Sequence, residues 1–248
     1  MNKKLALLGV TIVILFWFLI VQFQIIDKFF LPGPIEVFFE LGKLLTTGQL
    51  TTDIVMTLIR VTLSFILAAI IGIPIGLILG VFVKAYDFSE ILLDFARSTP
   101  ASAVFPLFLL LFGVDDKSKI AVSVFCISSI IIFNTAQGVR NSKKSRIEAA
   151  KLMGATKSQI FKEILFWESL PQTIIGLRTS ISFTLILIIL TEMFIGTEFG
   201  IGRKIIDYQY TYSISSLYAT IILIGLLGYL LNQAFALIEK KVVHWNGK

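Results

Sequence analysis

Histidine and cysteine are almost absent from this chain of 248 residues, which contains one of each, His244 and Cys126. Zinc centres are built mostly from several His and Cys ligands, so these two side chains cannot form one. A disulfide within the chain is excluded because it needs two cysteines. The phosphate-binding pattern G-x-x-x-x-G-K-[ST] is also missing, and the sequence therefore gives no sign that the chain hydrolyses ATP itself.

Charge is also scarce, because only 15% of the residues are charged whereas 56% are hydrophobic. Soluble domains carry about 25% charged residues and fewer apolar ones. This composition predicts an all-α, polytopic membrane protein. The net charge of +6 is explained by basic loops on the inner side of a bilayer, so no nucleic-acid partner is expected, only membrane lipid.

Apolar runs long enough to cross the hydrocarbon core recur along the chain. A cleaved signal peptide is an alternative interpretation of the first run, but this run is too long and no small-residue cleavage pattern follows it. We expect the whole chain, 1–248, to be one membrane domain. Its six expected transmembrane helices lie at about residues 5–26, 54–83, 98–113, 120–139, 174–196 and 214–238.

The distribution of basic residues predicts the orientation of these helices. With both termini in the cytoplasm, 15 of the 22 Lys and Arg residues lie on the inner side, as the positive-inside rule requires. The segment 84–97 is expected to be an inner loop, although its three acidic residues do not support this orientation. The main inner feature is the polar loop 140–171.

Three expected spans contain residues that are unusual in lipid. Pro100 and Pro106 should break the third span, and broken spans are tolerated only where the freed backbone meets protein or water, so an interior position is predicted. Arg60 and Glu192 lie at similar depth in the second and fifth spans. Buried charges of this kind either pair with each other or mark a substrate pathway, and their similar depth favours pairing.

A face of small residues occurs in the second span, where Gly72, Gly76 and Gly80 recur every four residues. Such a face lets another helix approach closely. Pro74 lies among them and could instead mark a gating hinge. Ordinary helix packing is the favoured interpretation.

The polar loop 140–171 is predicted to contain two short helices. Ser145 and Glu148 have the spacing of a capping box, and Gly154 can adopt the left-handed conformation that ends a helix. Thr156 and Gln159 repeat the capping-box spacing and should start the second helix, which Pro171 then interrupts or kinks. Because the first helix is too short to be stable alone in water, something must hold it.

The loop resembles the EAA loop of ATP-binding-cassette (ABC) importer permeases. The residues that carry this resemblance are Glu148, Ala149, Ala150, Gly154, Ile164, Leu170 and Pro171. The sequence LPGP at 31–34 is similar to the permease branch that transports nitrate, aliphatic sulfonates, taurine and pyrimidine precursors of thiamine.

The resemblance implies a type I importer permease fold in a prokaryotic plasma membrane. The first helix of the polar loop would dock on a separate ATP-binding subunit. This contact would couple ATP hydrolysis in that subunit to transport through the permease. Two ATP-binding subunits, a second permease subunit (expected to be a copy of this chain) and an extracytoplasmic substrate-binding protein are the implied partners. The chain itself would be non-catalytic and would bind no cofactor. The implied coupling residues are Glu148, Ala149, Ala150, Gly154, Ala155, Leu170 and Pro171, and the cargo would be a small anion or a thiamine precursor.

Two functions of other classes remain as alternatives. A secondary transporter would need no ATPase, but it usually shows inverted repeats, and none is clear in this sequence. An intramembrane enzyme would need several catalytic groups within its spans, whereas Glu192 is the one carboxylate placed firmly inside a span.

Overall fold

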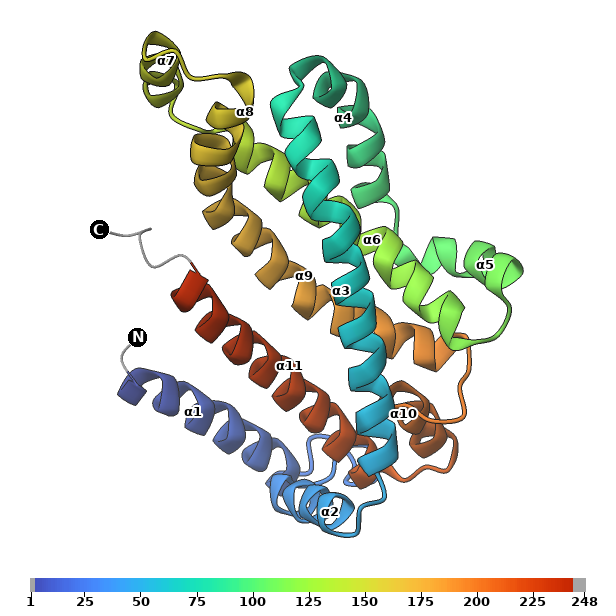
Figure 1. The fold of residues 1–248 in the computed structure, drawn as a ribbon. Coiled ribbons are helices and arrows are strands. Elements are labelled where there is room, and N and C mark those ends of the chain that lie inside the picture. Colours follow the sequence, from blue (N-terminus) through green and yellow to red (C-terminus); the bar gives the residue numbers. More distant parts are fainter. Residues whose placement is uncertain (1–2, 243–248) are drawn as a thin grey trace. The chain divides into compact units, whose positions relative to one another are not determined.

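The computed structural model describes residues 3–242, so His244 lies outside the described part. The described residues form helices and no strand, which confirms the all-α fold (Figure 1). The helices are α1 (Lys3–Gln22), α2 (Pro34–Thr46), α3 (Thr51–Val81), α4 (Val83–Ser98), α5 (Ala101–Phe112), α6 (Asp116–Arg140), α7 (Lys144–Leu152), α8 (Lys157–Ile160), the π-helix η1 (Phe161–Leu165), α9 (Phe166–Phe194), α10 (Ile201–Tyr210) and α11 (Ile214–Val242).

These helices form two compact units. The first comprises Met1–Thr57 with Glu198–Leu227, and the second comprises Leu58–Thr197 with Gly228–Lys248. The organisation of the chain as one membrane domain stays a prediction.

The first unit has a small apolar core where α2 packs against the first part of α11. The LPGP turn is fixed here, because the Trp17 indole N–H of α1 donates to the Pro32 carbonyl at 3.1 Å. The Ser216 hydroxyl donates to the Glu40 carboxylate at 2.9 Å. The core residues of this unit are Val37, Leu44, Leu50, Ala219 and Leu223.

The start of α10 is also fixed within the first unit. The backbone N–H of Gly200 donates to the Asp53 carboxylate at 2.8 Å, and the N–H of Ile201 donates to the Thr57 hydroxyl at 3.0 Å. These two side chains satisfy N–H groups that have no partner within the helix itself.

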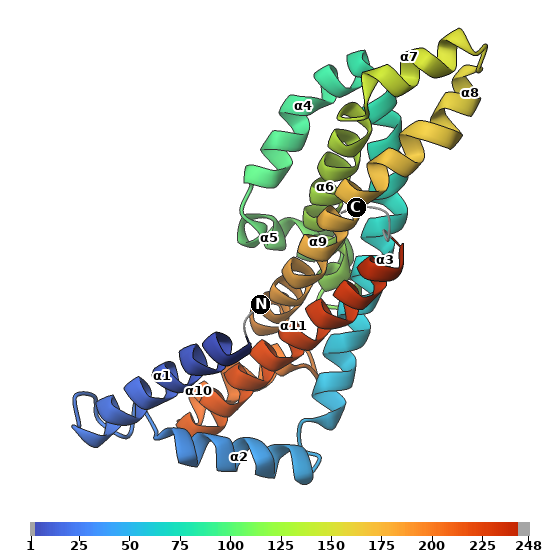
Figure 2. The same ribbon diagram turned by 90° about the vertical axis from the view of Figure 1, so that its left-hand side faces the viewer.

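The second unit is built around α6 and α9, which lie side by side in both views (Figure 1, Figure 2). The glycine face of α3 packs on α6, because a Cβ atom added at Gly76 would lie 2.6 Å from the Cβ of Thr135. Gly72 and Gly80 meet α6 equally closely. The packing interpretation of these glycines is therefore confirmed.

By length and composition, four helical stretches of the described chain could cross a membrane. They are α3, α6, the continuous run Lys157–Phe194 and α11. A fifth would be α4 and α5 taken as one broken span, and α1 contains a shorter apolar helix, Leu7–Gln22. The count of six spans stays a prediction.

The segment 84–97, expected to be an inner loop, instead forms the helix α4, and its position on the inner side stays a prediction. Phe88, Ile91, Leu92 and Phe95 recur at helical spacing and are exposed. The acidic residues between them lower the average hydropathy of the segment, which concealed this apolar stripe.

Residues 98–113, the expected third span, hold one short helix, α5. It is long enough to cross a membrane only together with α4, which it meets at a bend of 96°. The break at Pro100 is confirmed: Thr99 before it is extended, with ψ of 121°, as proline requires of the residue it follows. A break at Pro106 is wrong, because Pro106 lies inside α5, where it removes one hydrogen bond without ending the helix.

Pro171 does not interrupt its helix either. It lies in the second turn of α9, which continues to Phe194. The irregular part of this long helix comes earlier, as the π-helical turn Phe161–Leu165. The helix expected to begin at residue 174 therefore joins directly onto the loop.

Candidate functional site

The start of α7 is held by a residue from another helix. The expected capping box of Ser145 and Glu148 is wrong, because the N-cap residue is Lys143 and no side chain of α7 itself caps the helix. Instead, the Glu168 carboxylate of α9 accepts hydrogen bonds from the Lys143 N–H and from the Arg146 guanidinium, each at 2.7 Å. A negative charge at a helix N-terminus is favourable, so Glu168 braces α7 against α9.

The end of α7 depends on Gly154, whose φ of +83° is the left-handed conformation predicted from the sequence. The N–H of Ala155 donates to the Ala150 carbonyl and the N–H of Gly154 donates to the Lys151 carbonyl, both at 3.0 Å. These two bonds make a Schellman motif, which satisfies the last carbonyl groups of the helix. The chain thereby turns sharply into α8.

The start of α8 carries the capping box that the sequence predicted. The Gln159 N–H donates to the Thr156 hydroxyl at 3.3 Å, and the Thr156 N–H donates to the Gln159 side chain at 2.8 Å. Three residues therefore fix the turn between α7 and α8 from within.

The surface of this loop is unusually open. No residue of α7 is buried, and Glu148 makes no hydrogen bond or ion pair within residues 3–242. The apolar side chains of Leu152 and Met153 are 90% and 86% exposed. A cavity of about 350 Å³ lies beneath the turn, lined by Ala150, Met153, Gly154, Ala155, Gln159, Ile160, Glu163 and Ile164.

An exposed helix of nine residues is not stable in water by itself, and exposed apolar side chains at its tip favour contact with another surface. The arrangement presents α7, fixed at both ends, to something outside the chain. Such a contact can transmit motion to α9, because Glu168 and the turn connect the two helices.

The predicted coupling residues fall into two groups. Ala150, Gly154 and Ala155 lie together at the cavity beneath the turn, and Glu148 and Ala149 are exposed on α7. Leu170 and Pro171 lie on α9 instead, and neither lines this cavity.

Sequence reasoning missed three residues of this site. Leu152 and Met153 lie directly before Gly154, the glycine that ends the helix. Their position next to this glycine could have predicted that they are exposed at the tip of α7. Glu168 contacts α7 across more than twenty residues of sequence, and no local pattern indicates that contact.

A second site is a buried cluster of charges in the same unit. The Arg60 guanidinium contacts Glu192 at 2.6 Å and Asp116 at 2.8 Å, and it donates to the Thr197 hydroxyl at 3.0 Å. Lys119 contacts Asp116 at 3.3 Å. The expected pair of Arg60 and Glu192 is therefore confirmed.

This cluster joins α3, the start of α6 and the end of α9. The side chains of Arg60 and Glu192 are only 3% and 0% exposed, and two positive groups balance two negative groups. A buried pair with this geometry fixes the packing of the helices, since leaving either charge alone would be costly.

Residues 72–244 match the family described as the inner membrane component of binding-protein-dependent transport systems. The chain belongs to this family.

Its curated relatives include permeases named for several solutes. The chain is 26% identical to a putative aliphatic sulfonates transport permease of Bacillus subtilis, covering 97% of this chain and 87% of that one. It is 25% identical to the taurine transport permease of Escherichia coli, covering 94% and 86%. It is 30% identical to the nitrate import permease of Synechocystis, covering 86% and 80%.

Solved structures show the same fold. A subunit of the MetNI methionine ABC transporter in an inward-facing conformation matches with a TM-score of 0.69 and 22% identity, covering 78% of this chain and 96% of that one. An amino acid ABC transporter matches with a TM-score of 0.59 and 17% identity, covering 81% and 95%.

Family membership establishes the general role of this permease. It is a multi-pass inner membrane subunit of an ABC transporter, and it is a transport subunit rather than an enzyme. An ATP-hydrolysing subunit and a substrate-binding protein are its partners.

Proposed function

We propose that this permease is the translocation subunit of an ATP-driven importer and that α7 docks on its ATP-binding subunit. The support for this docking is the geometry of α7. The helix is braced by Glu168 at its start and by Gly154 at its end, yet it buries no residue and exposes Leu152 and Met153 at its tip.

The proposed orientation places the loop of α7 and α8, together with both termini, in the cytoplasm. Seven basic residues lie between Arg140 and Lys162, and basic residues favour the inner side. The ATP-binding subunit uses cytosolic ATP, so α7 can contact that subunit only from the cytoplasmic side of the membrane.

The proposed assembly contains two copies of this chain, two ATP-binding subunits and one extracytoplasmic substrate-binding protein. The cargo is a small anion or a thiamine precursor. Support for an anion comes from the names of the relatives, which specify aliphatic sulfonates, taurine and nitrate.

In the proposed mechanism, α7 moves as a rigid body with its ATP-binding subunit. Closure of the ATP-bound pair shifts α9 through Glu168 and the turn at Gly154, so that the pathway opens outward, and hydrolysis resets it. Coupling of this kind requires two conformations that each partner stabilises differently.

The assembled complex provides the test. Gly154→Val should lower substrate-stimulated ATPase activity, because a β-branched residue resists the left-handed conformation. Gly154→Asn is the matched control, since asparagine tolerates this conformation and no atom lies within 4 Å of an added Cβ. Ala150→Trp should also reduce the stimulation, by filling the cavity beneath the turn.

Charge reversal tests the open face of α7. Glu148→Arg should reduce the stimulation, whereas Glu90→Arg makes the same change on exposed α4 and should leave it intact. All variants should reach the membrane in normal amounts. Normal stimulation in Gly154→Val, Ala150→Trp and Glu148→Arg would refute the docking role.

A further inference from the structure

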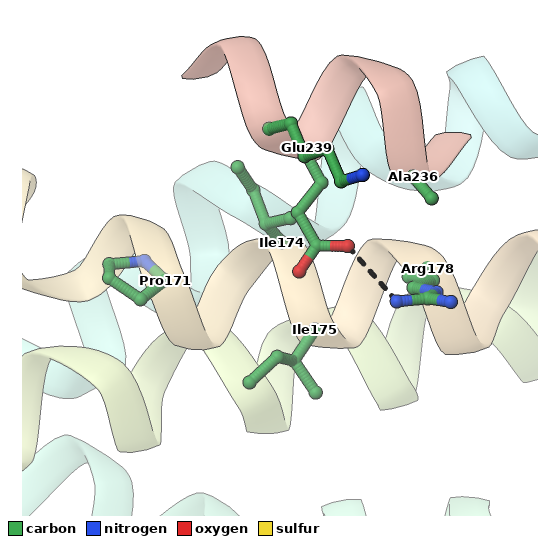
Figure 3. Close-up of a pocket in the computed structure, with 7 residues that line it drawn as sticks. Pro171, Ile174, Ile175, Arg178, Ala236 and Glu239 are labelled. Atoms are coloured by element: carbon green, nitrogen blue, oxygen red, sulfur yellow. Dashed lines mark hydrogen bonds and ion pairs between the residues drawn. The ribbon is translucent and has the colours of Figure 1, made fainter. Parts of the chain in front are cut away.

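A second cavity lies between α9 and α11, within the second unit, and has a volume of about 430 Å³. Figure 3 shows the side chains that line it. Its apolar walls are Ile174 and Ile175 of α9 and Ala236 of α11, and its charged groups are Arg178, Glu239 and Lys240. The transport mechanism proposed above uses none of these charges.

The guanidinium of Arg178 is held in place on one side only. Its Nε donates to the Asn232 side chain at 2.9 Å, and its Nη1 contacts Glu239 at 3.2 Å, a contact that Figure 3 marks with a dashed line. Its Nη2 has no hydrogen-bond partner among residues 3–242, and the side chain is 47% exposed. A guanidinium fixed in this way is oriented to bind a further oxyanion.

The charges around the cavity leave one positive group in excess. Glu239 balances Arg178, whereas Lys240 forms no ion pair within the described part of the chain. Two cationic side chains from neighbouring helices therefore face a space that is large enough for a phosphate group.

The depth of the cavity indicates where such an anion comes from. Arg178 precedes Glu192 on the same helix by about 21 Å, at 1.5 Å per residue, and the hydrocarbon core is about 30 Å thick. Lys240 lies in the last turn of α11, at the end of a helix that is long and apolar enough to cross a membrane. These positions fit a cavity at the level where lipid headgroups meet the acyl chains.

We propose that this cavity binds the phosphate headgroup of an anionic phospholipid. Arg178 and Lys240 contact the phosphate oxygens, as in other basic pockets between membrane helices. The exposed apolar side chain of Ile175, which lines the cavity, can contact the acyl chains. The site goes beyond the transport function, and it does not depend on which way the permease faces.

The test uses the full transporter complex purified in detergent. Phosphatidylglycerol and phosphatidylcholine are titrated in parallel, and bound lipid is counted by native mass spectrometry. The wild type should bind its first phosphatidylglycerol more tightly than phosphatidylcholine. Arg178→Gln and Lys240→Gln should each weaken that first site by about fivefold, as expected for a basic residue at an anionic headgroup.

Lys241→Gln is the matched control, because Lys241 is exposed on the same helix but does not line the cavity. It should weaken phosphatidylglycerol binding by less than about twofold. Lys240 makes no hydrogen bond or ion pair among residues 3–242, so Lys240→Gln removes no such bond from the fold.

Three results would overturn the proposal. Equal losses in Lys240→Gln and Lys241→Gln would mean that only the general charge of α11 matters. Unchanged lipid preference in Arg178→Gln and Lys240→Gln would exclude the site. Displacement of phosphatidylglycerol by millimolar inorganic phosphate would show that the cavity takes a soluble oxyanion instead of a lipid.

Discussion

Glu168 is the residue on which the placement of α7 depends most directly. Its carboxylate accepts from the backbone of Lys143 and from the side chain of Arg146, so it acts as an N-cap supplied by another helix. Loss of a capping side chain costs about 1 kcal/mol. This cost falls on α7 alone, because α7 has no buried residue to hold it otherwise.

We therefore expect Glu168→Ala to raise the hydrogen exchange rate of the α7 backbone amides by about fivefold, which corresponds to about 1 kcal/mol. The exchange of α6 and α9 should stay unchanged. Glu90→Ala makes the same change at an exposed position on α4 that makes no hydrogen bond or ion pair among the described residues, and it should leave α7 unaffected. Equal exchange in wild type and Glu168→Ala would show that the brace does not hold α7.

Arg60 is the central residue of the buried charge cluster. With Lys119 it balances Asp116 and Glu192, so replacing Arg60 alone leaves one buried negative charge in excess. Breaking a buried pair from one side costs about 3–5 kcal/mol.

Arg60→Met should accordingly lower the thermal stability of the detergent-solubilised permease sharply. The double variant Arg60→Met with Glu192→Met restores the balance of charge and should recover much of that loss. If the double variant is less stable than Arg60→Met, the two residues do not act as a pair.

Among the elements, α3 and α6 pack closely through the glycine face of α3. An added Cβ at Gly76 would lie 2.6 Å from Thr135 and 2.7 Å from the Ile132 carbonyl oxygen, which is shorter than real contacts. Gly76→Leu should therefore separate α3 from α6 and reduce the amount of folded permease in the membrane.

The matched control for this prediction is Gly225→Leu in α11, where nothing lies within 4 Å of an added Cβ. Its folded yield, measured by fluorescence-detected size-exclusion chromatography, should match that of the wild type. Similar yields for Gly76→Leu and Gly225→Leu would mean that the glycine face is not a packing surface.

Elements set by local chemistry were predictable from the sequence. Gly154 ends α7 and Thr156 starts α8 as expected, because caps depend on residues within one turn. Elements set by distant contacts were not, since Glu168 caps α7 from another helix. Helix α4 was missed for another reason: its acidic residues lowered the hydropathy of a segment whose apolar spacing is helical.

Across the whole molecule, composition was sufficient to predict a polytopic membrane protein, and the resemblance of the polar loop to the EAA loop implied an ABC importer permease. The Arg60 and Glu192 pair could also be predicted, because charges at equal depth in lipid have few other partners. The cargo, by contrast, is selected by a separate binding protein in the proposed system, so the relatives named for sulfonates, taurine and nitrate narrow it only to a chemical class.

The most direct measurement of the central claim is the accessibility of α7 itself. Lys151 is exposed on this helix, and Lys151→Cys in a Cys126→Ser background gives a single reactive thiol. A membrane-impermeant maleimide should label it in inverted membrane vesicles and not in intact cells, and rebinding of the ATP-binding subunit should block the labelling. Labelling from outside intact cells, or labelling unaffected by the ATP-binding subunit, would contradict this account.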